Sequence, residues 1–236
     1  LSNAFGAMEN LPGAINYLVK ETAHKYNVDY VIFDMNPSLS AINEDIFICS
    51  DYFIIPTSPD LFSLMSIDSL TRVLCSWEKW AKRARPMFEN ATYPLPVTSP
   101  IFLGYTINDF NLSHGHPQRT FRDFMDQISE KITTEFFSSL QENGMTFSPE
   151  KYQTAYQNMS NLSRTHSINY KDFYCLAQIS NFNKLIAMSN SCSKPIFELE
   201  LNPEIQRDGQ ERTLNWFKFL YDALAKRVME LAEDER

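Results

Sequence analysis

The acidic side chain best placed to do chemistry in this sequence is Asp34, which closes a short apolar run. That run, residues 30–33, is rich in β-branched and aromatic residues, as is typical of a strand buried on both faces of a parallel sheet. A second apolar run follows at 52–56. Open α/β sheets bind their ligands outside the carboxyl ends of the strands. Asp34 is therefore predicted either to face a ligand or, more simply, to cap the turn at the end of a strand.

Other groups give weaker signals. His114 and His116, with Asp109 nearby, could bind a metal, but two histidines one residue apart lack a third ligand in register. No Gly-x-Ser-x-Gly motif supports a serine hydrolase. The helix predicted at 61–83 ends in a basic cluster, made of Lys79, Lys82, Arg83 and Arg85. This cluster is interpreted either as a solvated helix end or as a non-specific DNA contact. Its tryptophans, Trp77 and Trp80, are expected in the core or on an oligomer face.

These residues need elements to position them, and the hydrophobic periodicity predicts the elements. Helices are expected at about 14–26, 42–49 and 61–83, and strands at 30–34 and 52–56. A strand at 101–107 follows, then helices at 117–140 and 149–160, a strand at 174–179, a helix at 182–191, an extended segment at 194–199 and a helix at 210–233. The early alternation predicts an α/β fold with a mostly parallel sheet and helices on both faces.

Three segments carry further expectations. Four prolines between 85 and 100 indicate a connector, expected to be flexible. Residues 141–172 are polar and are expected to form an irregular or helical insertion. The last helix is predicted to bury one apolar face, made of Leu214, Phe217, Leu220, Leu224, Val228 and Leu231.

Composition narrows the class of protein. The chain has 236 residues, is 44% hydrophobic and carries a net charge of −8, which disfavours a surface that coats nucleic acid but permits a local basic patch. Its four cysteines are widely spaced, which favours reduced thiols in a cytoplasmic protein. No apolar run approaches the roughly 18 residues of a membrane helix, so no membrane partner is expected.

Two runs and one residue between them resemble the ParA/MinD-type partition ATPases, a family with a deviant Walker A loop. Residues 29–39, Asn43 and residues 50–60 resemble the family's Walker B segment: an apolar strand, an acid, a proline-containing turn and a second strand ending in Ile-Pro. Residues 102–108 and 179–197 match more weakly. The resemblance implies a P-loop NTPase-like domain over 1–236 that lacks the family's first strand, phosphate-binding loop and first helix. It also implies a role in plasmid or chromosome partitioning or in cellular positioning.

The resemblance also implies roles for individual residues. Asp34 would be the catalytic-site acid that holds the Mg²⁺ of ATP through water, a ligand that Mg²⁺ retains readily. Asn36 and Pro37 would belong to the switch turn beside the γ-phosphate, and Asn108 would contact adenine. An intact relative would use ATP and Mg²⁺, form a homodimer around the nucleotide, bind DNA non-specifically and respond to a partition-type partner protein.

The phosphate-binding half of that site has no counterpart in residues 1–28. The family's Lys-Gly-Gly-x-Gly-Lys-Thr loop is absent there, and the whole chain has only six glycines. A nucleotide triphosphate carries about four negative charges, which Asp34 alone would repel. We therefore expect no ATP hydrolysis and no bound ATP or Mg²⁺ in this chain as given, whether it is a fragment of an ATPase or has lost the loop.

The alternative belongs to another class. A non-catalytic interaction module on a degenerate ParA scaffold would use an open sheet edge or the Phe-rich helix at 117–140 to bind a protein partner or a second copy.

Overall fold

The computed structural model describes residues 11–36, 38, 40–160, 170–200 and 210–233. The chain forms two compact units, one from 1–53, 67–102 and 135–146, and the other from 54–66, 103–134 and 147–236. Among the described residues, no helix combines the length and the apolar composition needed to cross a bilayer.

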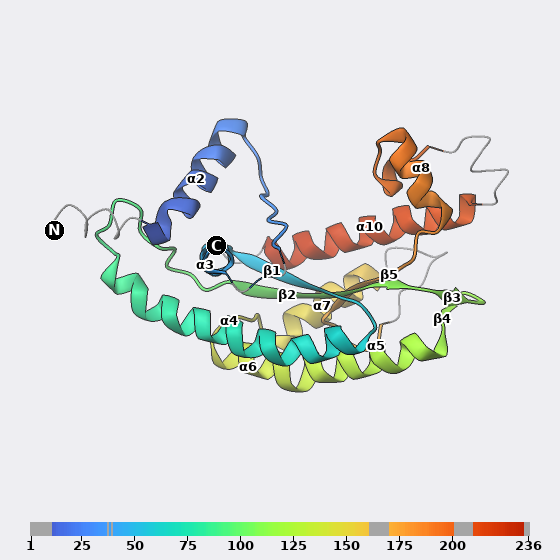
Figure 1. Ribbon diagram of the computed structural model, residues 1–236, viewed down its shortest axis with the longest axis horizontal. Coiled ribbons are helices and arrows are strands. Elements are labelled where there is room, and N and C mark those ends of the chain that lie inside the picture. Colours follow the sequence, from blue (N-terminus) through green and yellow to red (C-terminus); the bar gives the residue numbers. More distant parts are fainter. Residues whose placement is uncertain (1–10, 37, 39, 161–169, 201–209, 234–236) are drawn as a thin grey trace. The chain divides into compact units, whose positions relative to one another are not determined.

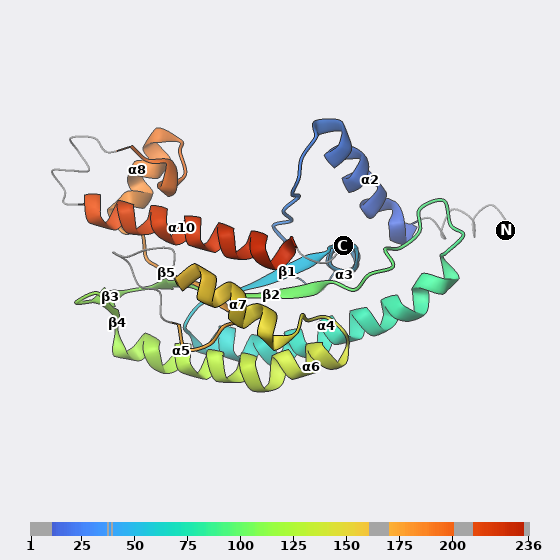
Figure 2. The same ribbon diagram turned by 180° about the vertical axis from the view of Figure 1, so that it is seen from behind.

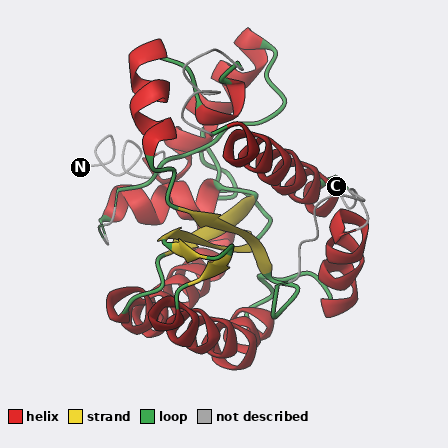
Figure 3. Ribbon diagram, turned by 90° about the vertical axis from the view of Figure 1, so that its right-hand side faces the viewer, coloured by secondary structure: helices red, strands yellow, loops and turns green. Residues whose placement is uncertain are grey.

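The expected α/β architecture is confirmed. Strands β1 (Tyr52–Thr57), β2 (Ile101–Phe110) and β5 (Cys175–Ser180) form a parallel sheet in the order β1-β2-β5, with helices on both faces (Figures 1 and 3). In the β2–β5 pair, Tyr105 lies opposite Cys175 and Asn108 opposite Ile179. A short hairpin, β3 (Leu112–Ser113) with β4 (His116–Pro117), follows β2.

The predicted strand at 30–34 is wrong. The structure gives these residues no regular secondary structure, and the whole run is exposed, Ile32 at 91%. A strand is defined by its ladder, and residues 29–35 make no backbone hydrogen bond to any other part of the chain that the structure describes. β-Forming residue types therefore do not become a strand here, because no neighbour completes the pairing.

The helices mostly fall where periodicity predicts them. In chain order they are α2 (Leu11–Tyr26), α3 (Ala41–Cys49), α4 (Leu61–Met87), α5 (Arg119–Lys131), α6 (Phe137–Glu142), α7 (Pro149–Ser160), α8 (Lys184–Cys192) and α10 (Glu211–Ala232). A π-helical turn, Ile132–Phe136, replaces the middle of the helix predicted at 117–140. The predicted extended segment at 194–199 contains a 3-10 turn, Ile196–Glu198.

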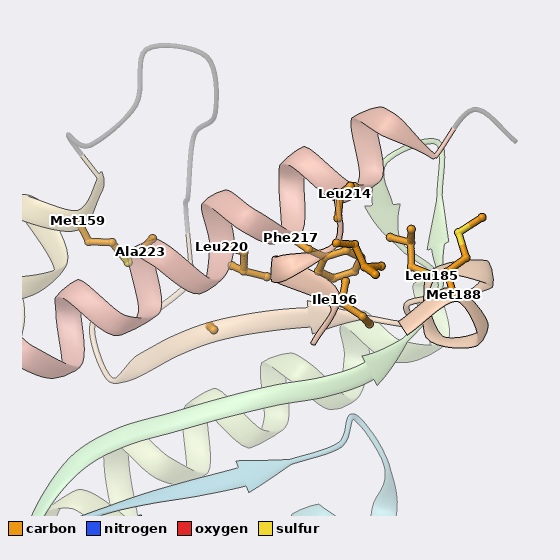
Figure 4. Packing of buried hydrophobic residues seen from close by; sticks show 10 residues of the cluster. Met159, Leu185, Met188, Ile196, Leu214, Phe217, Leu220 and Ala223 are labelled. Atoms are coloured by element: carbon orange, nitrogen blue, oxygen red, sulfur yellow. The ribbon is translucent and has the colours of Figure 1, made fainter. Parts of the chain in front are cut away.

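The core of the second unit is built on α10. Its buried face contacts α7, β5 and the 3-10 turn, and Figure 2 shows α7 and α10 running side by side. The packed cluster consists of Met159, Ala177, Leu185, Met188, Ile196, Leu199, Leu214, Phe217, Leu220 and Ala223 (Figure 4). Four of the six residues predicted to be buried are buried: Leu214, Phe217, Leu220 and Leu231. The other two, Leu224 and Val228, are half-buried, because Ala223 and Arg227 take the buried positions there.

Arg227 is fully buried within this otherwise apolar face. Its guanidinium donates to the backbone carbonyls of Cys175 (2.5 Å) and Phe173, and it lies 5.3 Å from the ring centre of Tyr156. The two carbonyls belong to the chain entering β5. A polar side chain in the apolar stripe thus ties the C-terminal helix to the first residues of the strand.

A buried carboxylate, that of Asp172, also binds the residues that lead into β5. Asp172 accepts hydrogen bonds from Tyr105 Oη (2.6 Å), Ser129 Oγ (2.5 Å) and the backbone amides of Tyr174 (2.7 Å) and Cys175 (2.9 Å). Burial raises the pKa of Tyr105, so its phenol stays protonated and donates. The carboxylate therefore joins β2, α5 and β5.

The first unit has an aromatic core. Phe47 on α3 packs against Phe53 (5.1 Å between ring centres) and Trp77 (5.8 Å), and Phe102 continues the chain of rings to Phe53 (5.5 Å) and Phe136 (5.3 Å). Trp77 is half-buried and packs against the edge of this core, which is close to one of its two predicted placements. Trp80 remains 39% exposed.

An ion pair fixes the proline-rich connector to α4. Glu78, which is fully buried, accepts from Arg85 Nη1 (2.8 Å), Arg85 Nη2 (3.2 Å) and Ser99 Oγ (2.6 Å). Arg85 also donates to the carbonyls of Pro96 (2.7 Å) and Thr98 (2.9 Å). The prediction of a solvated Arg85 is therefore wrong, because its guanidinium bonds to both the helix and the connector.

Breaking this pair should destabilise the first unit strongly. Arg85→Met removes the cation nearest to the buried Glu78 carboxylate and leaves only Lys82 Nζ, at 3.9 Å. The expected loss in the free energy of unfolding is about 3–5 kcal/mol in urea titrations. The matched control is Lys226→Met, which removes the exposed Lys226–Asp222 pair (2.8 Å) and should cost under about 0.5 kcal/mol. Equal losses in the two variants would contradict the role of the buried pair.

Candidate functional site

Asp34 lies in the exposed segment that precedes α3, on the first unit. Because residues 30–34 form no strand, its carboxylate does not stand at a strand end as predicted. An exposed carboxylate of this kind keeps its oxygens available to the water shell of a cation.

The turn after Asp34 is locked onto the start of α3 by one amide. Asn43, which is 3% exposed, donates through Nδ2 to the carbonyl of Asn36 (2.8 Å), to Asn36 Oδ1 (3.2 Å) and to the carbonyl of Ser38 (2.6 Å). Ser38 Oγ also donates to Asn36 Oδ1 (2.5 Å), and Ser40 caps the helix by accepting from the Asn43 amide (3.3 Å). These hydrogen bonds tie Asn36 and Ser38 to the first turn of α3.

Two of the predicted site residues belong to this turn. Asn36 uses its carbonyl and its side-chain oxygen to hold the turn, so the part of it suited to a phosphate is its Nδ2 donor. Pro37 lies outside the described residues. Asn43 was part of the sequence resemblance without an assigned role, and the structure identifies it as the residue that positions the others.

A carboxylate and a thiol pack where α3 meets α2. Cys49 Sγ lies 3.7 Å from Asp45 Oδ1 and 3.8 Å from the carbonyl of Pro12. Burial raises the pKa of Asp45 to about 6 and, together with the neighbouring carboxylate, raises that of Cys49 to about 12. Cys49 is therefore a protonated packing residue rather than a nucleophile.

The carboxyl ends of β1, β2 and β5 form a polar edge on the second unit. Where β1 ends, Thr57 is buried and its hydroxyl donates to the carbonyl of Thr106 (2.8 Å). The next loop caps α4 reciprocally: Asp60 Oδ1 accepts from the Ser63 amide (2.7 Å), and Ser63 Oγ accepts from the Ser58 amide (2.9 Å). This is the edge at which open parallel sheets bind ligands.

Asn108 lies on that edge, as the sequence predicts. Its Nδ2 donates to Thr106 Oγ1 (3.1 Å), and the next residue, Asp109, has a positive φ of 59° where the β2–β5 register shifts. Asp109 Oδ1 accepts from Asn181 Nδ2 (3.1 Å), and the Asn181 amide donates to the carbonyl of Phe110 (2.9 Å). Asn181 was missed from the sequence, although an Asn that follows a β-type run would have indicated it.

The candidate residues thus fall into two groups. Asp34, Asn36 and Asn43 belong to the first unit, and Asn108, Asp109 and Asn181 belong to the second. The metal alternative for Asp109 gains no support, because the described residues contain no cluster of three or more His, Cys, Asp or Glu side chains suited to a metal ion. His114 and His116 lie on the β3–β4 hairpin, where Ser113 Oγ is 3.1 Å from His114 Nδ1.

The basic cluster on α4 is partly used in packing. Lys82 Nζ donates to the carbonyl of Asn143 (2.5 Å), and Arg85 is bound to Glu78. Lys79 and Arg83 are exposed, and Arg83 Nε donates to the carbonyl of Lys79 (3.2 Å). Two of the four charges thus support the fold of the first unit.

Comparison with known proteins adds a family likeness over part of the chain. Residues 7–84 match a family model described as "AAA domain", which represents ParA/MinD-like P-loop ATPases. The matched part includes Asp34, the turn held by Asn43, β1 and most of α4. No curated protein and no solved structure matches the chain.

The turn held by Asn43 should loosen when that amide is removed. Asn43→Ala deletes three hydrogen bonds made by a buried side chain, and the expected cost is about 1–3 kcal/mol in urea titrations, with faster hydrogen exchange at the Ser40–Asn43 end of α3. Asn158→Ala, which removes an exposed bond to Glu230 (2.5 Å), should change stability by no more than about 0.5 kcal/mol. Unchanged exchange in Asn43→Ala would refute the locking role.

Asp45 should make stability fall as pH rises. Its pKa is higher in the folded chain (about 6) than its ordinary value of 3.8, so the folded state holds the proton more tightly and loses stability between about pH 4 and pH 6. Asp45→Asn should therefore stabilise the protein at pH 7.5 relative to the parent, and less so at pH 4, in urea titrations. The exposed Asp123→Asn is the control, and a parental pH dependence in Asp45→Asn would contradict the assignment.

Proposed function

We propose that this chain carries the Mg²⁺ and switch side of a ParA-like ATPase site, in a protein that partitions DNA or positions a cellular cargo. The observation that supports this proposal is the joint occurrence of Asp34 and the turn locked by Asn43 within the segment that matches the ParA/MinD-like family. In such a site Asp34 would accept from waters on the nucleotide's Mg²⁺, and the locked turn would keep the acid and Asn36 in a fixed order around the phosphates.

The residues present fit the metal side of the site and not the phosphate side. Asp34 is the oxygen donor that a hydrated Mg²⁺ prefers, but the segment around it carries Asp29 as well and no cation between 26 and 36. Bound phosphates need backbone amides and lysines to offset their charge. We therefore assign no hydrolytic step to this chain acting alone. A glycine-rich loop from further sequence or from a second chain would have to complete the site.

For Asn108, on the second unit, we propose a contact with adenine. It stands at the carboxyl edge of a parallel sheet, beside Asp109 and Asn181, which together offer both donors and acceptors for a base. We also propose a nucleotide-dependent dimer that responds to a partition-type partner. Non-specific DNA contact would fall to the exposed Lys79 and Arg83.

Calorimetry and a hydrolysis assay test the proposal. The 236-residue chain should bind no Mg·ATP. A loop-containing form, extended by a Lys-Gly-Gly-x-Gly-Lys-Thr segment, should hydrolyse ATP, and Asp34→Asn should lower the kcat of that form by at least about 100-fold. Asp123→Asn is the matched control and should keep full activity.

Two results would contradict the proposal. Binding of Mg·ATP by the chain as given, lost in Asp34→Ala, would show that no further loop is needed. Hydrolysis that survives Asp34→Asn in the loop-containing form would remove Asp34 from the metal site.

A further inference from the structure

A polar hollow of about 380 Å³ lies between α4 and α6 on the first unit. Figures 1 and 2 show these two helices alongside each other. Proteins bind small molecules in hollows of this volume, where a few polar groups converge. The lining residues that matter for a ligand are Arg72, Cys75, Ser76 and Lys79 on α4, and Ser139 and Glu142 on α6.

Hydrogen bonds between the two helices fix the walls of the hollow. Cys75, which is buried, donates through Sγ to the carbonyl of Ser139 (3.7 Å). The same carbonyl accepts from Asn143 Nδ2 (2.8 Å), and Lys82 Nζ donates to the carbonyl of Asn143 (2.5 Å). Two bonds from α4 to α6 therefore set the distance between the walls.

The two walls carry charges of opposite sign. Arg72, Ser76 and Lys79 are exposed and share one face of α4, because they are spaced at i, i+4 and i+7. Glu142 is exposed on α6. Burial raises the pKa of the Cys75 thiol, Lys79 opposes this rise and Glu142 adds to it, so both charges lie close to the thiol between the walls. Although the structure describes all three side chains, no ion pair joins Glu142 to Arg72 or Lys79.

The charges select a class of ligand. Two cations and one carboxylate complement a molecule with two carboxylates and one ammonium, which is the charge pattern of an acidic α-amino acid. An arginine binds one carboxylate through two parallel N–H···O bonds, and a lysine ammonium binds another as a compact charge. A phosphate ester fits less well, because it would bring negative charge beside Glu142 and offer that carboxylate no cation.

We propose that the hollow between α4 and α6 binds an acidic α-amino acid. Arg72 and Lys79 would hold its two carboxylates, and Glu142 would accept from its ammonium. The hydroxyls of Ser76 and Ser139 would donate to the remaining carboxylate oxygens. This inference goes beyond the proposed function, since it needs neither nucleotide nor a further loop. Lys79 also belongs to the proposed DNA contact, so the amino acid and DNA would compete for this cation.

Isothermal titration calorimetry with L-glutamate tests the proposal on the 236-residue chain. We expect a Kd on the order of 0.1 mM, as suits a small charged ligand in an open hollow. Arg72→Gln and Lys79→Gln should each weaken binding at least about tenfold, because each removes the partner of one carboxylate. The matched control is Arg122→Gln, which removes an exposed cation on α5 and should leave the Kd unchanged.

Glutarate, which has two carboxylates and no ammonium, separates recognition of the amino acid from general anion binding. It should bind the parent at least about tenfold more weakly than L-glutamate, and Glu142→Gln should abolish this preference. Ser76→Trp fills the hollow from an exposed helix position, and it should abolish binding without a loss of stability in urea titrations. Absence of L-glutamate binding, equal affinity of the parent for L-glutamate and glutarate, or full affinity in Ser76→Trp would overturn the proposal.

Discussion

The carboxylate of Asp172 is the constraint on which the second unit depends. Its two oxygens take four hydrogen bonds, from a phenol on β2, a hydroxyl on α5 and two amides at the start of β5. A buried carboxylate is tolerated only when its lone pairs are filled in this way. By fixing where β5 begins relative to β2, it sets the register at which Asn108 and Asn181 reach the carboxyl edge of the sheet together.

The two groups of candidate residues, one on each unit, are stabilised by different means. On the sheet edge, side chains are placed by strand register and by a bulge at Asp109. Around Asp34 there is no strand, and a single buried amide, that of Asn43, gives the turn its shape. Sites on regular elements are more sharply defined than sites on loops. A turn held by one amide can also be rearranged by a ligand that competes for the same acceptors, which suits a switch.

The sequence predicted strands β1, β2 and β5 from short apolar runs and most helices from the 3.6-residue period, because both patterns follow from burial of one segment's own side chains. It failed where structure depends on a neighbour. Residues 30–34 have strand-forming side chains, but residue type does not supply the strand that must lie alongside. Arg227 interrupts an apolar stripe that periodicity assigned to Val228, since the carbonyls of Phe173 and Cys175 are visible only in the fold. Arg85 likewise appeared as one charge in a basic run, and its buried partner Glu78 lies seven residues earlier, beyond the usual helical spacing.

Arg227 also makes the second unit depend on a contact between segments that are synthesised at different times. The chain leaves the ribosome N-terminus first. The carbonyls of Phe173 and Cys175 are therefore synthesised before the guanidinium that donates to them, which lies 52 residues after Cys175. Before α10 is synthesised, no guanidinium is available to these two carbonyls. Burying them under apolar side chains at that stage would leave them without this hydrogen-bond donor. The contact between α10 and the residues that lead into β5 therefore joins segments far apart in the sequence, and it can form only after α10 has been synthesised.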